Sequence, residues 1–218
     1  MARVACARAK LSQYAALFWD FDGVIKESVA VKTAAFERLF GCFGPALATR
    51  VREHHERNGG MSRLEKIPLY LSWTERSATP KEVQHYCALF SAAVRQAVID
   101  SAWVPGVREY LQANYARQFF VLVTATPQSE IQEILSALGI AHCFRQVHGA
   151  PVRKVQAIVS ALNYSGCRRE DALLIGDSEA DHEAARSVGL DFLLRRTAFN
   201  RALQQVYAGP QCENFIDE

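Results

Sequence analysis

Five short apolar runs are spaced along the chain, and helical periodicity fills most of the sequence between them. The runs are 15–18, 119–123, 144–148, 172–175 and 192–194. Short apolar runs bounded by turn residues are typical of buried strands, whereas apolar positions every three or four residues indicate helices. Helical segments follow the later runs, at 130–138, at 154–162 and up to Val188. This alternation predicts an α/β fold with a Rossmann-like parallel sheet and helices on both faces.

Between the first and second runs the pattern is helical only. Segments 33–40 and 46–57 have helical spacing, another helix starts after Ser62, and Thr79-Pro80 opens a long helix that reaches about Ile99. No part of 26–99 has a strand pattern. We therefore expect a helical cap at 26–99, inserted into a catalytic core formed by 1–25 and 100–218.

Polar side chains come directly after several predicted strands, at Asp20, Asp22, Thr124 and Asp177. Parallel sheets bind their ligands at the carboxyl ends of the strands, so these positions are the first candidates for a site. Two carboxylates as close as Asp20 and Asp22 repel each other unless a cation or a shared proton relieves them. The pair therefore indicates a metal site; the alternative is a polar turn with both acids in solvent.

Four segments, in order, resemble the motifs of the haloacid dehalogenase (HAD) superfamily. Asp-Phe-Asp-Gly-Val-Ile at 20–25 is similar to its first motif, Asp-x-Asp-Gly-(Thr/Val)-(Leu/Ile). Thr124 after an apolar strand resembles the second motif, Lys154 at the start of a helix the third, and Gly-Asp-x-x-x-Asp at 176–181 the fourth. The resemblance covers nearly the whole chain and points to the C1-capped branch that includes phosphoglycolate phosphatases and β-phosphoglucomutases.

Each later motif also has an ordinary structural explanation. A threonine at the end of a strand often caps the next helix, and most lysines are exposed, with Arg153 an adjacent rival to Lys154. Asp177 would then be a helix N-cap and Asp181 a first-turn acid favoured by the helix dipole. We assign the capping role to Thr126, which precedes Pro127, and the phosphate role to Thr124.

The resemblance implies a Mg²⁺-dependent phosphatase that acts on a small phosphorylated metabolite, either phosphoglycolate-like or a sugar phosphate monoester. Asp20 would attack phosphorus and form an aspartyl-phosphate. Asp22 would protonate the leaving group and then activate water. Thr124, the backbone N–H of Ala125 and Lys154 would bind the phosphoryl oxygens.

The same resemblance implies where the metal and the substrate's leaving group lie. Mg²⁺ would be held by Asp20, the backbone carbonyl of Asp22 and Asp177, while Asp181 would orient Lys154 or a metal-bound water, or bind the metal itself. Cap loops of relatives face the active site, so segment 59–66 is expected to contact substrate. Within it, Arg63 or Lys66 would meet a substrate anion, unless they are surface charges.

Three other activities use the same scaffold. A sugar-phosphate mutase has the same core residues and differs in how long the phospho-enzyme survives water. A dehalogenase needs neither a metal nor the second aspartate, so Asp22 and the acidic fourth motif argue against it. A catalytically silent binding protein is the third alternative, since a fold alone does not prove activity.

The composition limits the kinds of partner that the protein is expected to bind. The formal net charge of +2 over 218 residues does not suggest a nucleic-acid partner, and no apolar run approaches the ~20 residues that span a bilayer. Six cysteines without CxxC spacing are expected to be reduced thiols of a cytoplasmic protein. We expect a small phosphate ester as ligand, a monomer or homodimer, and a ragged surface extension at 1–10.

Overall fold

A sheet of parallel strands lies at the centre of the structure, a computed structural model that describes residues 11–74 and 78–216. Within these ranges six strands pair in the order β3-β2-β1-β4-β5-β6, with every neighbouring pair parallel. The strands are β1 (Ala16–Trp19), β2 (Phe119–Pro127), β3 (Gln146–Ala150), β4 (Ala172–Gly176), β5 (Asp191–Arg195) and β6 (Gln211–Cys212).

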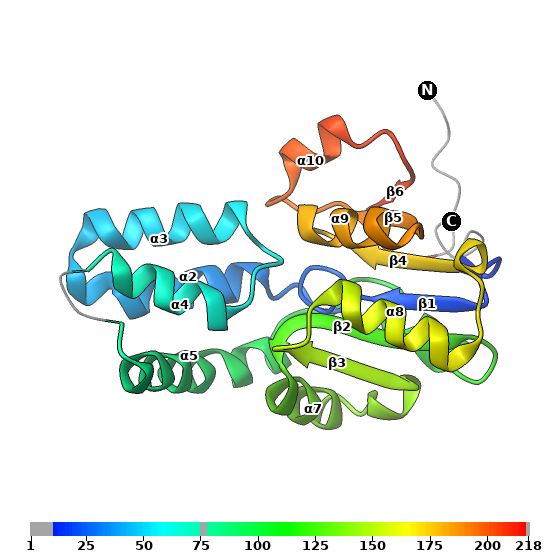
Figure 1. The fold of residues 1–218 in the computed structure, drawn as a ribbon, viewed down its shortest axis with the longest axis horizontal. Helices are drawn as coiled ribbons and strands as arrows, with labels where there is room; N and C mark the ends of the chain where they lie inside the picture. Colours follow the sequence, from blue (N-terminus) through cyan, green and yellow to red (C-terminus); the bar gives the residue numbers. More distant parts are fainter. Residues whose placement is uncertain (1–10, 75–77, 217–218) are drawn as a thin grey trace.

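Helices cover both faces of the sheet and also form a separate group at one end (Figure 1). The α-helices are α2 (Val29–Phe40), α3 (Pro45–Arg57), α4 (Arg63–Ser72), α5 (Pro80–Asp100), α6 (Val107–Asn114), α7 (Gln128–Ala137), α8 (Lys154–Ser165), α9 (Glu179–Val188) and α10 (Arg201–Val206). Short 3-10 turns lie at η1 (Gly41–Phe43), η2 (Ala141–Cys143) and η3 (Arg169–Asp171). No helix in the described ranges has both the length and the apolar character that a membrane span requires.

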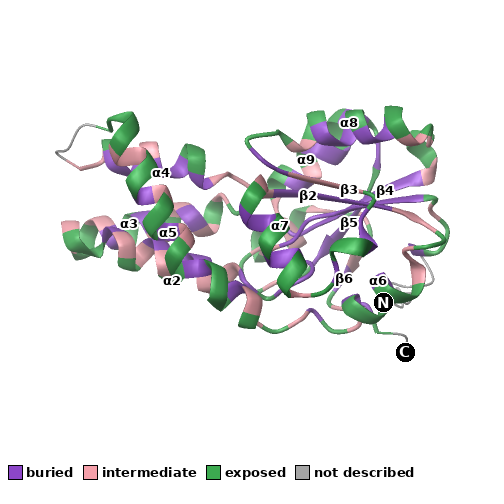
Figure 2. Ribbon diagram, turned by 90° about the horizontal axis from the view of Figure 1, so that it is seen from below, coloured by how far each residue is buried: buried purple, intermediate pink, exposed green. Residues whose placement is uncertain are grey.

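Side chains of the strands alternate between two apolar layers, because successive residues of a strand point to opposite faces. In β1, Leu17 and Trp19 belong to the layer that α6 and α7 cover, whereas Ala16 and Phe18 belong to the layer under α8 and α9. The central strands β1 and β4 are wholly buried between the helices, and β2 is mostly buried (Figure 2). Burial on both faces explains why the strands read as continuous apolar runs in the sequence.

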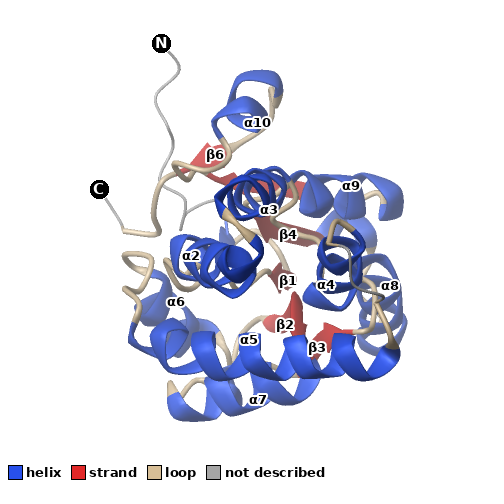
Figure 3. Ribbon diagram, turned by 90° about the vertical axis from the view of Figure 1, so that its left-hand side faces the viewer, coloured by secondary structure: helices blue, strands red, loops and turns tan. Residues whose placement is uncertain are grey.

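Helices α2 to α5, which we call the cap, pack against one another beside the sheet (Figures 1 and 3). Their interior is aromatic and buried, and it is continuous with one apolar layer of the core; its rings belong to Phe36, Phe40, Tyr70, Tyr86 and Phe90. Helix α5 of the cap packs against α7 of the core, so that side chains of the cap and the core meet in one apolar cluster. The boundaries at 26 and 99 remain our proposal for the division of the chain.

The register of the sheet places the candidate residues on one edge. Trp19 is level with Leu122 of β2 and with Ile175 of β4. Asp20 and Asp177, which follow β1 and β4, and Thr124, which lies within β2 two residues after Leu122, are therefore at nearly the same height on neighbouring strands. The backbone N–H of Asp20 donates to the carbonyl of Ile175 at 3.0 Å, which extends the pairing to the first candidate residue.

The predicted parallel sheet and helical cap are confirmed, with local corrections. The weak run at 144–148 is displaced, since β3 starts at Gln146, and α10 and β6 were not predicted. In the C-terminal tail Phe215 is fully buried and Ile216 is half exposed. The predicted N-terminal extension at 1–10, including Cys6, lies outside the described residues.

Candidate active site

Three carboxylates and one ammonium gather at the carboxyl edge of the sheet. Asp20, Asp177 and Asp181 each offer an oxygen that lies within 4.8 Å of the others. Lys154, the first residue of α8, donates from Nζ to Oδ1 of Asp20 at 2.8 Å and also contacts Oδ1 of Asp181. We call these four residues the acidic edge, and all of their side chains are buried or nearly so.

Asp181 is fixed by the start of its own helix. Ser178 is the N-cap of α9, and its hydroxyl and backbone N–H both donate to Oδ2 of Asp181, at 2.6 and 3.1 Å. The other oxygen of Asp181 contacts Lys154. Because both oxygens are engaged, the geometry favours Asp181 as the residue that orients Lys154. The alternative of Asp177 as the N-cap is wrong, since Ser178 holds that position.

Two glycines leave room for these carboxylates. A Cβ on Gly23, whose φ is +75°, would lie 2.2 Å from Oδ2 of Asp177, and a Cβ on Gly176 would lie 2.3 Å from Cβ of Asp181. Any larger residue at 176 would displace Asp181, and at Gly23 the backbone conformation adds strain. Gly23 of the first motif thus leaves the space that the carboxylate of Asp177, in the fourth motif, occupies.

The acidic edge has more negative than positive charge. Burial raises the pKa of Asp20 to about 7; the charge of Lys154 opposes this, and Asp181 and Asp22 add to it. Burial and the charge of Asp20 raise the pKa of Asp177 well above its ordinary value. Among the described residues no hydrogen bond reaches the Asp177 carboxylate, although its side chain is nearly enclosed. Oxygen donors in such a cluster suit a hard divalent cation such as Mg²⁺.

Asp22 lies among a different set of partners. Lys32 of α2 contacts its Oδ2, Ser28 donates to its Oδ1 at 2.5 Å, and the Thr126 hydroxyl lies 3.3 Å from Oδ2. Burial alone would raise the pKa of Asp22, but the charge and hydrogen bond of Lys32, with smaller effects of Ser28 and Arg63, hold it below its ordinary value. The carboxylate of Asp22 is therefore ionised and does not belong to the metal-ligand cluster. Its backbone carbonyl remains a predicted ligand.

Thr124 and Ala125 lie in the last part of β2, which continues past the predicted run at 119–123 and ends at Pro127, directly before α7. The Thr124 hydroxyl is buried and accepts from the backbone N–H of Thr126 at 3.2 Å, while Ala125 is half-buried. Thr126 does not cap α7, whose N-cap is Pro127, and this part of the sequence interpretation is wrong. Instead its hydroxyl accepts from Nζ of Lys32 at 2.8 Å, next to Asp22.

Arg63 and Lys66 are buried, so the alternative that they are surface charges is wrong. Arg63 donates to both oxygens of Glu130 on α7, at 2.9 and 2.5 Å. Lys66 lies 2.9 Å from Nδ1 of His55 on α3. With Lys32 these two residues form a group that we call the cap cations.

Lys66 sits in an environment that disfavours its charge. Burial lowers the pKa of Lys66 to about 7, and the charge of Lys32 adds to the effect. Burial also lowers the pKa of His55 well below its ordinary value, so the imidazole is neutral and its Nδ1 accepts from Lys66. The Phe36 ring lies 5.8 Å from the ammonium. Whether Lys66 contacts substrate stays a prediction.

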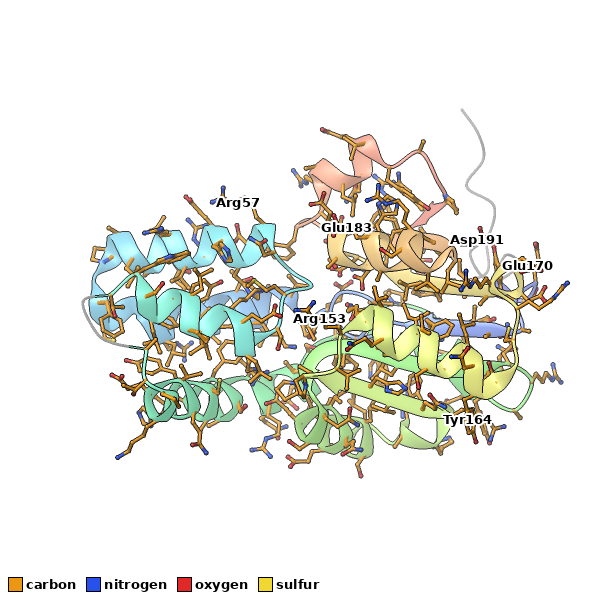
Figure 4. The ribbon with its side chains drawn as sticks, in the orientation of Figure 1. Arg57, Arg153, Tyr164, Glu170, Glu183 and Asp191 are labelled. Atoms are coloured by element: carbon orange, nitrogen blue, oxygen red, sulfur yellow. The ribbon has the colours of Figure 1, made fainter. Side chains whose placement is uncertain are left out.

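Several residues of the site were missed from the sequence, namely Ser28, Lys32, His55 and Glu130. Lys32 had a signal: it lies four residues before Phe36 and eight before Phe40, on the buried stripe of α2. Glu130 had a similar sequence signal, because it lies four residues before the buried Ile134 on α7. Arg153, the rival of Lys154, is exposed at the end of α8 nearest the cap (Figure 4).

Comparison with known proteins places this geometry in a family. The model of the family described as haloacid dehalogenase-like hydrolase matches residues 17–194. A search of curated protein sequences found no match. Among solved structures, CbbY from Rhodobacter sphaeroides in complex with xylulose-(1,5)bisphosphate is similar, with a TM-score of 0.75 and 17% identity over 93% of this chain and 95% of that chain.

Two further structures have the same fold. CbbY in complex with phosphate has a TM-score of 0.74 and 18% identity over 93% of this chain and 95% of its own. A predicted phosphoglycolate phosphatase from Haemophilus somnus has a TM-score of 0.72 and 20% identity, over 93% and 95% of the two chains. At these identities the likeness shows a shared fold.

Proposed function

The chain belongs to the haloacid dehalogenase-like hydrolase family, and on that premise we propose that it is a Mg²⁺-dependent phosphatase of small phosphate monoesters. The reaction would proceed through an aspartyl-phosphate on Asp20. Support for the substrate class comes from the neighbour CbbY, whose structures contain phosphate and a sugar bisphosphate.

The observation that carries the proposal is the buried, undercompensated acidic edge. Three carboxylates face the single ammonium of Lys154, and the Asp177 carboxylate has no hydrogen-bond donor among the described residues. Burying unpaired carboxylates is costly, so a site of this kind is built for a cation. Asp20, Asp177 and the backbone carbonyl of Asp22 would hold Mg²⁺, which when bound screens the repulsion between nucleophile and phosphate.

Each residue of the edge then has a role. The free oxygen of Asp20 attacks phosphorus in line with the leaving oxygen, and the bond to the leaving group breaks as the aspartyl-phosphate forms. Lys154, oriented by Asp181, and the Thr124 hydroxyl with the N–H of Ala125 bind the other phosphoryl oxygens. Water then hydrolyses the acyl phosphate and restores the Asp20 carboxylate.

Asp22 transfers the protons. Because its carboxylate is ionised in the structure, it must first take up a proton when the ester binds; it then donates this proton to the leaving oxygen in the first step and accepts one from water in the second. Lys32, Ser28 and Thr126 hold its carboxylate in place, with both oxygens hydrogen-bonded. Lys32 comes from the cap, so Asp22 is fully positioned only when the cap is closed over the edge.

Phosphate release from a panel of small phosphate esters tests this proposal. Wild type should release phosphate with Mg²⁺ and not with EDTA, and Asp20→Asn should abolish turnover while remaining folded. Asp191→Asn is the matched control, because Asp191 is exposed at the start of β5 and its side chain accepts a hydrogen bond from the Tyr14 hydroxyl. Turnover by Asp20→Asn, or turnover in EDTA, would contradict the mechanism.

The same panel separates the alternatives. A mutase would release phosphate slowly and speed up isomerisation when a bisphosphate sugar is added. A dehalogenase and a silent binding protein would both release no phosphate from any ester. Any of these outcomes would replace the phosphatase proposal.

A further inference from the structure

A buried ion pair joins the cap to the core. Arg63 of α4 and Glu130 of α7 are each about 95% buried, with exposed fractions of 5% and 6%. The guanidinium donates to both oxygens of Glu130 and, at 2.6 Å, to the hydroxyl of Ser91 on α5. It also lies 4.5 Å from the centre of the Phe90 ring.

The chain segments that carry Arg63 and Glu130 both contact residues of the active site. Three residues before Arg63, an added Cβ on Gly60 would lie 2.7 Å from the hydroxyl of Ser178, which holds Asp181. Four residues before Glu130, the hydroxyl of Thr126 lies 3.3 Å from Oδ2 of Asp22, the residue that would protonate the leaving oxygen. The pair therefore lies on the Asp22 side of the site, where the proposed mechanism places the leaving oxygen. Since the cap covers that side, the leaving group of a bound ester is the part of the substrate that would meet Arg63.

Charges on this side are already balanced. Glu130 neutralises Arg63, and Asp22 neutralises Lys32. Lys66, the third of the cap cations, has a neutral imidazole as its partner and loses its own charge near neutral pH. A leaving group with a carboxylate or second phosphate would have to separate Arg63 from Glu130 or lie beside the Glu130 carboxylate. Breaking a buried, bidentate pair is costly.

We propose that Glu130, by holding Arg63, makes the site selective for phosphate esters whose leaving group carries no second anion. This inference rests on the proposed phosphatase function and narrows its substrates to polyol- or sugar-type monoesters. It also revises the prediction that Arg63 meets a substrate anion: in this chain the arginine is matched by an acid of the core. Glu130 is thus a specificity-determining residue that touches neither the phosphate nor the metal.

Two esters of nearly equal size separate charge from shape. Hydroxyethyl phosphate and phosphoglycolate differ in whether a hydroxymethyl or a carboxylate group is carried next to the ester carbon. Wild type with Mg²⁺ should have a kcat/KM about tenfold or more higher for hydroxyethyl phosphate, the order of effect expected for one added charge in a partly buried site.

Variants of the pair should move this preference in opposite directions. Glu130→Gln frees the charge of Arg63 and should raise the relative kcat/KM for phosphoglycolate about tenfold. Arg63→Gln leaves the Glu130 carboxylate uncompensated and should lower it by a similar factor. The ratio of the two esters is the readout, so a general loss of activity in either variant does not mimic the effect, and either variant alone suffices if the other does not fold.

Glu133→Gln is the matched control. Glu133 lies one turn further along α7 and also pairs with a cap residue, Arg95 of α5, but both side chains are about half exposed. It should leave the ester ratio unchanged. A wild-type preference for phosphoglycolate, or equal shifts in Glu130→Gln and Glu133→Gln, would overturn the inference while leaving the phosphatase intact. No turnover of any ester by wild type would remove the proposed function and the inference together.

Discussion

The acidic edge and the cap cations solve the problem of buried charge in different ways. At the acidic edge three carboxylates share one ammonium, and burial raises the pKa of Asp20 to about 7. Each of Lys32 and Arg63 instead has its own carboxylate partner, and burial lowers the pKa of Lys66 so that it loses its charge near neutral pH. The acidic edge has fewer positive than negative groups, whereas each charged residue among the cap cations has a carboxylate partner.

This difference indicates what each region does. A cluster that is unbalanced by itself is stable only with a bound cation, which fits a metal and phosphate site. A region whose charges are paired internally gains nothing from a further ion, which fits recognition of an uncharged leaving group and closure of the cap. Variants that change the balance in one region at a time test the contrast.

Removing the single cation of the acidic edge should have the largest effect. Lys154→Met leaves Asp20 and Asp181 without their shared partner and removes a donor to the phosphoryl group, so kcat should fall roughly a hundredfold to a thousandfold. Steady-state phosphate release measures it. Arg153→Met is the control, because this neighbouring cation is exposed, and an equal loss there would show that the wrong residue was chosen.

Breaking the pair between Arg63 and Glu130 should mainly cost stability. Glu130→Gln leaves a buried guanidinium without its full counter-charge, and the free energy of unfolding should fall by about 3 kcal/mol. Glu133→Gln breaks the exposed pair beside it and should cost less than about 0.5 kcal/mol. Urea denaturation of both variants measures the difference. Similar small losses would mean that the buried pair is not special.

A methyl group at Gly23 should displace the Asp177 carboxylate of the acidic edge. Gly23→Ala combines a left-handed backbone conformation with a Cβ that meets the Asp177 carboxylate, so it should cost about 2 kcal/mol and raise the Mg²⁺ concentration needed for half-maximal activity. Gly139→Ala isolates the backbone effect, because φ there is +69° and nothing lies within 4 Å of the added atom. It should cost about 1 kcal/mol and leave the Mg²⁺ dependence unchanged. Equal Mg²⁺ dependence in both variants would argue against Asp177 as a ligand.

The two regions also differ in how far the sequence predicts them. Asp20, Thr124 and Asp177 follow apolar strands, and the parallel topology brings the ends of such strands together, so their meeting could be inferred from local pattern. The partner of Arg63 could not, because Glu130 is 67 residues away and meets it through the packing of α4 on α5 and of α5 on α7. The burial of Lys66 likewise depends on His55 and Phe36 of two other helices.

Neutralising Lys66 should produce the most pH-dependent effect. The pKa of Lys66 is about 7 in the folded protein and 10.5 in a model peptide, so between these values the unfolded chain binds a proton that the folded chain lacks. Stability therefore rises with pH across this window, by up to about 1.4 kcal/mol per pH unit from this one group. Lys66→Met removes the contribution and should flatten the curve.

The variant should be more stable than wild type at pH 7, and the advantage should shrink as the pH rises toward and above 10.5, where Lys66 of the unfolded wild-type chain also loses its proton. His55 does not obscure the result, because burial lowers its pKa well below 6.5 and it stays neutral throughout. Chemical denaturation in EDTA at several pH values measures the two curves, with Lys81→Met, on the exposed first turn of α5, as control. Parallel curves for wild type and Lys66→Met would mean that Lys66 keeps its charge when buried, and the cap cations would then carry an unmatched positive charge that could meet an anionic leaving group.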